Sequence, residues 1–195
     1  MEENTIILNG NNFIGEKINI NLNELDKKKS AEYIIIKNCK ITKELTNKIL
    51  NLKKIKNIWL VNCNIIESIN IPNIEILRIE KCENIENILY SNSLTQLYVN
   101  NCNRFDIKNI KDIKLKILGL EYLEINNFYL LEEMKTLEKL ELKEIDLRNI
   151  NFVNLKHLKK IVLNGSIVNN KEETIKYLKN SGVEVEFLEK NLPIG

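Results

Sequence analysis

Four cysteines are the residues of this 195-residue chain whose chemistry most resembles that of a metal or redox site. Cys39, Cys63, Cys82 and Cys102 are 24, 19 and 20 residues apart, and no close C-x-x-C pair of the kind used by zinc sites is present. The spacing instead gives all four the same slot of a repeat, where they would stack roughly 4.8 Å apart on successive coils. A small, weakly polar side chain suits a tight turn after a strand, and free cysteine is usually buried. We therefore expect structural cysteines, no metal or cofactor, and a reducing compartment.

Residues for acid–base or nucleophilic catalysis do not form a recognisable motif. The one histidine, His157, lies in NLKHLKK without a nucleophile or carboxylate spaced to work with it, and we expect it on the convex surface. The carboxylates of Glu132, Glu133, Glu138 and Glu141 alternate with lysines, as on a solvated face. No phosphate-binding loop or zinc-hydrolase helix is found. The sequence predicts no enzyme, and a deep polar pocket would be the sign of one.

The charge balance indicates neither a polyanion partner nor a membrane partner. Twenty-nine basic residues stand against twenty-seven acidic residues. The lysines at 27–29 and at 53, 54 and 56 form short runs that could contact nucleic acid or a membrane surface, but such runs are usually solvated loops. The N-terminus has no signal-peptide pattern, and no apolar stretch approaches the ~20 residues of a membrane span. We expect a cytoplasmic protein.

A repeat of about 21 residues positions the cysteines. In each unit we take as the anchor the residue that lies three positions after the second of two alternating apolar residues. The nine anchors are Asn11, Cys39, Cys63, Cys82, Cys102, Leu123, Ile145, Ser166 and Leu188. The residues five and three before each anchor are all apolar, from Ile6 and Leu8 in the first unit to Val183 and Val185 in the last. Alternation with period two predicts a strand with one face inward. The fold class predicted is α/β, a solenoid with about nine short strands in one curved parallel sheet on its concave face and short helices and turns on its convex face.

The ends of the repeat array are expected to be atypical, because a terminal unit faces water on one side. Eight residues before the anchor, the seven inner units have an apolar residue, whereas the end units have Glu3 and Asn180. We predict one domain over 1–195, with an N-terminal capping unit at 1–23 and a C-terminal capping helix and strand at 167–195. Helices are predicted from about 43 to 52 after Thr42, and from 170 to 178 before Gly182.

The stretches Leu94–Phe105 (LTQLYVNNCNRF) and Ile74–Ile85 (IEILRIEKCENI) resemble the cysteine-containing class of leucine-rich repeats. The last units are similar to the short repeats of phosphatase-regulating proteins. The resemblance implies a protein-recognition scaffold, which in the first class is often joined to an F-box in ubiquitin-ligase adaptors. The present repeats are shorter than those of that class.

The residues four before each anchor are predicted to point out of the concave sheet. In the N-terminal half they form, with adjoining outward residues, an apolar and aromatic cluster, called here the Trp59 patch: Tyr33, Ile35, Trp59, Val61, Ile76, Arg78 and Tyr98. In the C-terminal half the outward residues form a mixed, mostly charged surface: Gly119, Glu121, Lys139, Glu141, Lys143, Lys160, Val162, Glu184 and Glu186. Trp, Tyr and Arg dominate interface hot spots, and an exposed apolar cluster usually marks a contact site.

The prediction from these residues is a non-enzymatic module that binds a protein partner on its concave face. An adaptor or regulatory subunit of a ubiquitin ligase or phosphatase complex is the alternative function. Self-association, or simple covering of the sheet by the patch, are the alternative interpretations of the patch itself.

Overall fold

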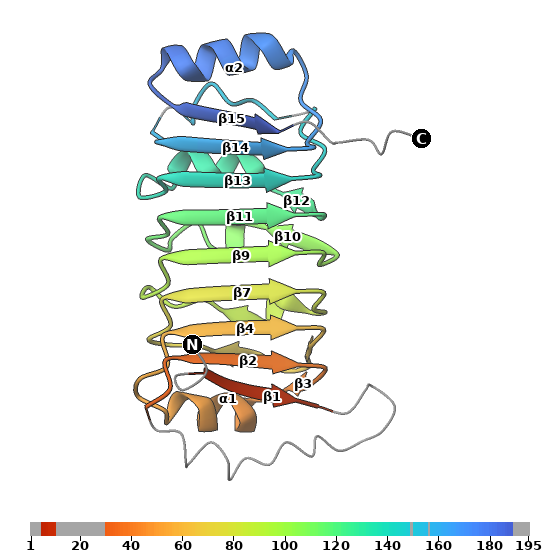
Figure 1. Cartoon of the computed structure of the whole chain (residues 1–195), viewed down its shortest axis with the longest axis vertical. Coiled ribbons are helices and arrows are strands. Elements are labelled where there is room, and N and C mark those ends of the chain that lie inside the picture. The colour runs from red at the N-terminus through yellow and green to blue at the C-terminus, as the bar shows by residue number, and fades with distance from the viewer. Residues whose placement is uncertain (1–4, 11–29, 149, 156, 189–195) are drawn as a thin grey trace.

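A single parallel sheet of nine strands runs through the chain, which a computed structural model describes at residues 5–10, 30–148, 150–155 and 157–188. Figure 1 shows the strands stacked in sequence order, neither closed nor curled, so the predicted curvature is not seen. The mixed α/β architecture with a repeating strand is compatible with a solenoid. The strands are β1 (Thr5–Asn9), β2 (Tyr33–Lys37), β4 (Asn57–Val61), β7 (Ile76–Glu80), β9 (Gln96–Asn100), β11 (Ile117–Glu121), β13 (Lys139–Lys143), β14 (Lys160–Asn164) and β15 (Glu184–Leu188).

Short segments connect the strands behind the sheet. Three small two-stranded sheets are formed by β3 (Lys40–Ile41) with β5 (Asn64–Ile65), β6 (Ile69–Asn70) with β8 (Ile88–Leu89), and β10 (Arg104–Asp106) with β12 (Glu124–Asn126). The helices are α1 (Lys43–Leu50), the 3₁₀ turns η2 (Ile85–Asn87), η3 (Ile107–Asn109) and η4 (Phe128–Glu133), and α2 (Lys171–Asn180). The connection between β2 and β4 holds an α-helix, as its longer spacing predicts, and the described residues between β4 and β14 form only 3₁₀ turns and extended pieces. The other longer connection, before β2, lies largely outside the described residues, and α2 lies in the last connection, between β14 and β15.

The inward residues of the strands are buried, as the alternation predicts. From Ile6 and Leu8 in β1 to Ile161 and Leu163 in β14, the second and fourth residues of each strand are at most 5% exposed. The apolar residues eight before the anchor, from Ala31 to Leu158, are at most 4% exposed. Each fully buried aliphatic side chain stabilises the fold by roughly 1.5 to 3 kcal/mol before chain entropy is counted. The core therefore extends continuously behind the sheet.

The register predicted for the last unit is wrong by two residues. Ile161 and Leu163 pair with Val185 and Phe187, so these are the inward residues of β15, rather than Val183 and Val185. Val183 instead closes the end of α2, where its amide donates to the Leu178 carbonyl at 3.0 Å. The connection from β14 to β15, which contains α2 and its cap, is two residues longer than the spacing predicted for the last unit. Alternation alone cannot detect this shift, because a slip of two residues leaves the same face inward.

A residue with left-handed backbone conformation follows each strand of the nine-stranded sheet from β2 to β14. These residues have φ between 50° and 62°, and they are Asn38, Asn62, Lys81, Asn101, Tyr122, Glu144 and Gly165. Asparagine and glycine tolerate this conformation best. Two of the asparagines also form a ladder, since Asn62 Nδ2 donates to Asn38 Oδ1 at 2.8 Å and Asn38 Nδ2 donates to Asn9 Oδ1 at 2.9 Å. The sequence analysis did not identify this repeated turn.

The cysteine slot follows this turn, and its side chains hydrogen-bond to the backbone. All four thiols are free and buried, and each donates to the carbonyl two residues before it, as Cys82 Sγ does to Glu80 at 3.3 Å. Cys82 Sγ also accepts from the amide of Cys63 at 3.3 Å. Ser166 accepts in the same way from the Ile145 amide, but its hydroxyl donates to the Leu142 carbonyl of the preceding coil, both at 3.2 Å. The prediction of structural cysteines agrees with these contacts.

Both predicted helices are confirmed. Thr42 caps α1, with its hydroxyl accepting from the Leu45 amide at 3.2 Å. Asn170 precedes α2, and Gly182 at φ 84° ends it with the backbone bonds of a Schellman turn. The helix and strand of the predicted C-terminal capping unit are thus present as far as Leu188. Most of the predicted N-terminal unit, including its anchor Asn11, lies outside the described residues, as do 189–195 and the lysines at 27–29.

Candidate functional site

The open face of the nine-stranded sheet, called here the sheet face, brings the seven predicted site residues together. The strand register aligns Ile35, Trp59, Arg78 and Tyr98 in one row across β2, β4, β7 and β9. Tyr33 and Ile76 lie in the row on one side, and Val61 lies in the row on the other side. Neighbouring strands are ~4.8 Å apart, so these side chains form one continuous surface. Their juxtaposition agrees with the prediction, and binding to them stays a prediction.

The exposure of the Trp59 patch is uneven. Tyr33 is 46% exposed and Trp59 is 37% exposed, while Ile35, Val61 and Ile76 are half-buried. Ile7 on the edge strand β1 extends the apolar row and is 60% exposed. Large apolar side chains on a solvent-facing sheet are costly to hydrate. A surface of this composition gains free energy when a partner covers it.

Arg78 and Tyr98 form a stacked pair at the centre of this surface. The Arg78 guanidinium carbon lies 4.8 Å from the centroid of the Tyr98 ring, within cation–π range. The Tyr98 hydroxyl donates to Gln96 Oε1 at a long 3.4 Å. Burial raises the pKa of Tyr98, and nearby Glu141 adds to that rise. The ring is therefore a neutral, amphipathic surface at physiological pH.

Gly119 leaves a hollow beside this pair. It follows Tyr98 in the central row, and a Cβ atom on it would lie only 2.5 Å from Tyr98 Cδ1. The missing side chain lets the ring lie over β11. The resulting hollow of about 190 Å³ is lined by Trp59, Arg78, Tyr98 and Gly119, with Glu80, Asn100 and Glu121 at its side. The sequence places Gly119 among the outward residues of the central row, where it is the only glycine, but its role beside Tyr98 was not predicted.

The C-terminal half of the sheet face carries charges of both signs, as predicted, and the structure shows that they pair with one another. Lys139 contacts Glu141 at 2.5 Å and Lys143 contacts Glu121 at 3.4 Å, and Lys160 contacts Glu184 at 2.7 Å and Glu186 at 3.0 Å. These carboxylates raise the pKa of Lys160. Exposed pairs of this type contribute little stability. They do neutralise one another, so this half offers a partner no strong net charge.

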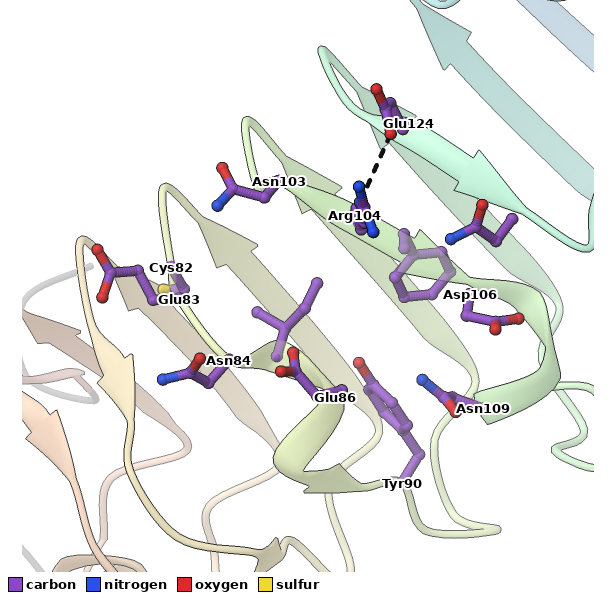
Figure 2. Close-up of a pocket in the computed structure, with 13 residues that line it drawn as sticks. Cys82, Glu83, Asn84, Glu86, Tyr90, Asn103, Arg104, Asp106, Asn109 and Glu124 are labelled. Atoms are coloured by element: carbon purple, nitrogen blue, oxygen red, sulfur yellow. Dashed lines mark ion pairs between the residues drawn. The ribbon is translucent and has the colours of Figure 1, made fainter.

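A larger groove of about 630 Å³ lies away from the sheet face, along β10, β12 and η2. Figure 2 shows its side chains coming from successive coils, with the Tyr90 ring reaching into it and Arg104 joined to Glu124. That ion pair measures 3.7 Å between exposed side chains. Asp106 Oδ1 accepts from the Lys108 amide and from Asn127 Nδ2. Part of the polar lining therefore shapes the coils themselves.

The chemistry of this groove gives no catalytic set. Its one thiol, Cys82, is buried, and its hydrogen bond with the Cys63 thiol together with burial raises its pKa, which disfavours the nucleophilic thiolate. No group of His, Cys, Asp and Glu able to hold a metal ion occurs among the described residues. His157 is half-buried rather than on the surface, outside the nine-stranded sheet, and burial lowers its pKa.

The comparisons with known proteins add no family. No protein-family model matches the chain, and a search of curated proteins finds no match. In the part of the chain that the structure describes, no helix is long and apolar enough to cross a membrane. The functional argument therefore depends on the sheet face and its residues.

Proposed function

We propose that this chain is a non-enzymatic leucine-rich-repeat protein that binds a protein partner through the Trp59 patch of its sheet face. The observation that carries the proposal is the row of Trp59, Arg78 and Tyr98, which places two aromatic rings and a guanidinium side by side on the sheet face. These three residue types dominate binding energy at protein interfaces, because they bury much area and keep a polar group for pairing. The repeated strand, the recurring turn and the buried cysteine slot support the leucine-rich-repeat assignment.

The location proposed is the cytoplasm. Four free, buried thiols with no disulfide among them fit a reducing compartment. The partner proposed is a protein rather than nucleic acid or a membrane, since the patch is apolar and the charges of the adjoining half are paired.

Affinity capture from lysate with mass spectrometry tests the proposal, followed by reconstitution with the purified partner. The wild type is compared with the double variant Trp59→Glu/Tyr98→Glu, after circular dichroism and thermal melting show that both fold. Tyr129→Glu is the matched control, because Tyr129 is 64% exposed and lies in η4, outside the sheet. We expect a partner lost only from the double variant. Equal capture by all three proteins contradicts the proposal.

The role of an adaptor or regulatory subunit stays a prediction of the same binding mode. A ligase or phosphatase catalytic subunit among the captured proteins, with activity altered by this chain, distinguishes it from a simple binding module. Self-association through the patch predicts instead a dimer in light scattering that Trp59→Glu converts to a monomer.

A further inference from the structure

The cations of the sheet face differ in how they are neutralised. Lys139, Lys143 and Lys160 each contact a carboxylate within 3.4 Å. Arg78 makes no ion pair and no hydrogen bond with any described residue, and its recorded contact is the stacking on Tyr98. A guanidinium without an ion-pair partner is free to form charge-assisted hydrogen bonds with a carboxylate. Arg78 is thus the uncompensated charge within the Trp59 patch.

The stacked geometry leaves Arg78 able to bind an anion. The guanidinium carbon lies over the Tyr98 ring, and none of the guanidinium N–H groups, which lie in the guanidinium plane, donates to a described residue. A planar fork of this kind matches a carboxylate with two parallel hydrogen bonds. The Tyr98 ring restricts the guanidinium before any ligand arrives, which lowers the entropy lost on binding.

The surroundings of Arg78 determine what else the ligand must have. Trp59 gives the hollow an apolar wall, and its volume of about 190 Å³ is enough for one side chain rather than a folded element. The two carboxylates that line it already have ammonium partners, since Glu80 lies 3.7 Å from Lys81 and Glu121 lies 3.4 Å from Lys143. Neither carboxylate forms an ion pair with Arg78, and the hollow offers an aromatic surface beside the guanidinium.

We propose that the hollow formed by Trp59, Arg78 and Tyr98 over Gly119 binds an aspartate or glutamate side chain of an extended partner segment, with an apolar side chain next to it on Trp59. This inference rests on the proposed function and specifies the partner's chemistry. The carboxylate pairs with the Arg78 guanidinium, and the adjoining apolar residue covers the indole. Specificity comes from the charge, and affinity comes from the aromatic area that is buried.

Selection from a phage-displayed library of linear peptides tests this inference, with the wild type, Arg78→Glu and Arg104→Glu as targets. Arg104 is the matched control, because its exposed side chain lies in the groove away from the sheet face. We expect the wild type and Arg104→Glu to select Asp or Glu beside an apolar residue. We expect Arg78→Glu to select Lys or Arg at the same place.

The selected peptide and its Asp→Asn or Glu→Gln form are then titrated, both without tryptophan and with an amidated C-terminus. Trp59 is the only tryptophan of the chain, so its emission reports binding at the patch. We expect the amide form to bind about 10- to 100-fold more weakly, and Arg78→Lys to recover part of the affinity lost in Arg78→Gln.

Two other results would overturn the assignment. If the bound peptides alter Trp59 emission but show no preference for Asp or Glu, the proposal that Arg78 binds an acidic side chain is refuted. The same holds if they bind only with a free C-terminal carboxylate. In both cases the proposed function of binding a protein partner remains supported. If no peptide depends on Trp59 and Tyr98, the proposed function fails as well.

Discussion

Ser166 provides a quantitative test of the repeated hydrogen bond behind the sheet. This buried residue, 5% exposed, occupies the slot that cysteine fills in four earlier coils. Its hydroxyl accepts from the Ile145 amide and donates to the Leu142 carbonyl. The substitution Ser166→Ala removes both contacts with little change in volume, whereas Ser166→Cys restores an atom able to make them.

The expected cost follows from the two groups that lose a partner. Ile145 is 4% exposed, so water cannot replace the lost acceptor of its amide. A buried donor left without a partner costs about 1 to 3 kcal/mol. The Leu142 carbonyl adds less, because a carbonyl oxygen with one remaining bond is only under-satisfied. For a domain of this length, Ser166→Ala should lower Tm by roughly 2 to 12 °C. Cys82 Sγ accepts a hydrogen bond from the Cys63 amide at 3.3 Å, so a cysteine can fill the same role in this slot. The free energy of unfolding of Ser166→Cys should therefore stay within about 1 kcal/mol of the wild-type value.

Urea denaturation and thermal melting of the three proteins, with Ser68→Ala as an exposed control, measure these differences. Equal destabilisation by alanine and cysteine would refute the equivalence of the two residues in this slot. A neutral Ser166→Ala would refute the hydrogen-bond argument itself.

Three other properties of the fold give measurable expectations. Lys81 adopts φ 52°, a conformation that asparagine and glycine prefer. The substitution Lys81→Asn should therefore raise the free energy of unfolding by about 1 kcal/mol. Thermal melting, with the exposed substitution Lys53→Asn as control, measures this change. Gly119→Ala should displace the Tyr98 ring, because the added Cβ would lie 2.5 Å from it; NMR contacts between the ring and Arg78 should then be lost while the protein stays folded, and unchanged contacts would contradict the close packing. Burial raises the pKa of Cys39 to about 11, above the ~8.5 of an unfolded thiol. As pH rises, the unfolded state therefore releases this proton before the folded state does. The stability present below pH ~8.5 should fall by at most about 1.4 kcal/mol per pH unit toward pH 11. Urea denaturation at pH 8 and pH 10 measures this fall, which should be smaller in a Cys39→Ala protein.

The predictions that succeeded depend on local patterns. Alternating apolar residues set which face of each strand is buried, since successive side chains point to opposite sides. The same reasoning located the seven residues of the Trp59 patch, because parallel strands in register align equivalent positions. Capping residues such as Thr42 and Gly182 located the helix ends.

The errors and omissions concern the relation between neighbouring coils. The final strand is shifted because the connection that contains α2 is two residues longer than the predicted spacing, and a shift of two keeps the apolar alternation unchanged. The curvature of the sheet was expected from the resemblance to a family, and Figure 1 shows an open stack instead.

The sequence by itself determined the period, the number of strands, the buried residues and the composition of the outward surface, because each depends on residues close together in the chain. Only the tertiary structure decided which outward charges are paired, that Arg78 stacks on Tyr98, and that Gly119 opens a hollow beside them. Those contacts join coils about twenty residues apart, and they depend on side-chain rotamers and strand register. That Arg78 has no ion-pair partner among the described residues is therefore a property of the packed sheet rather than of any one repeat.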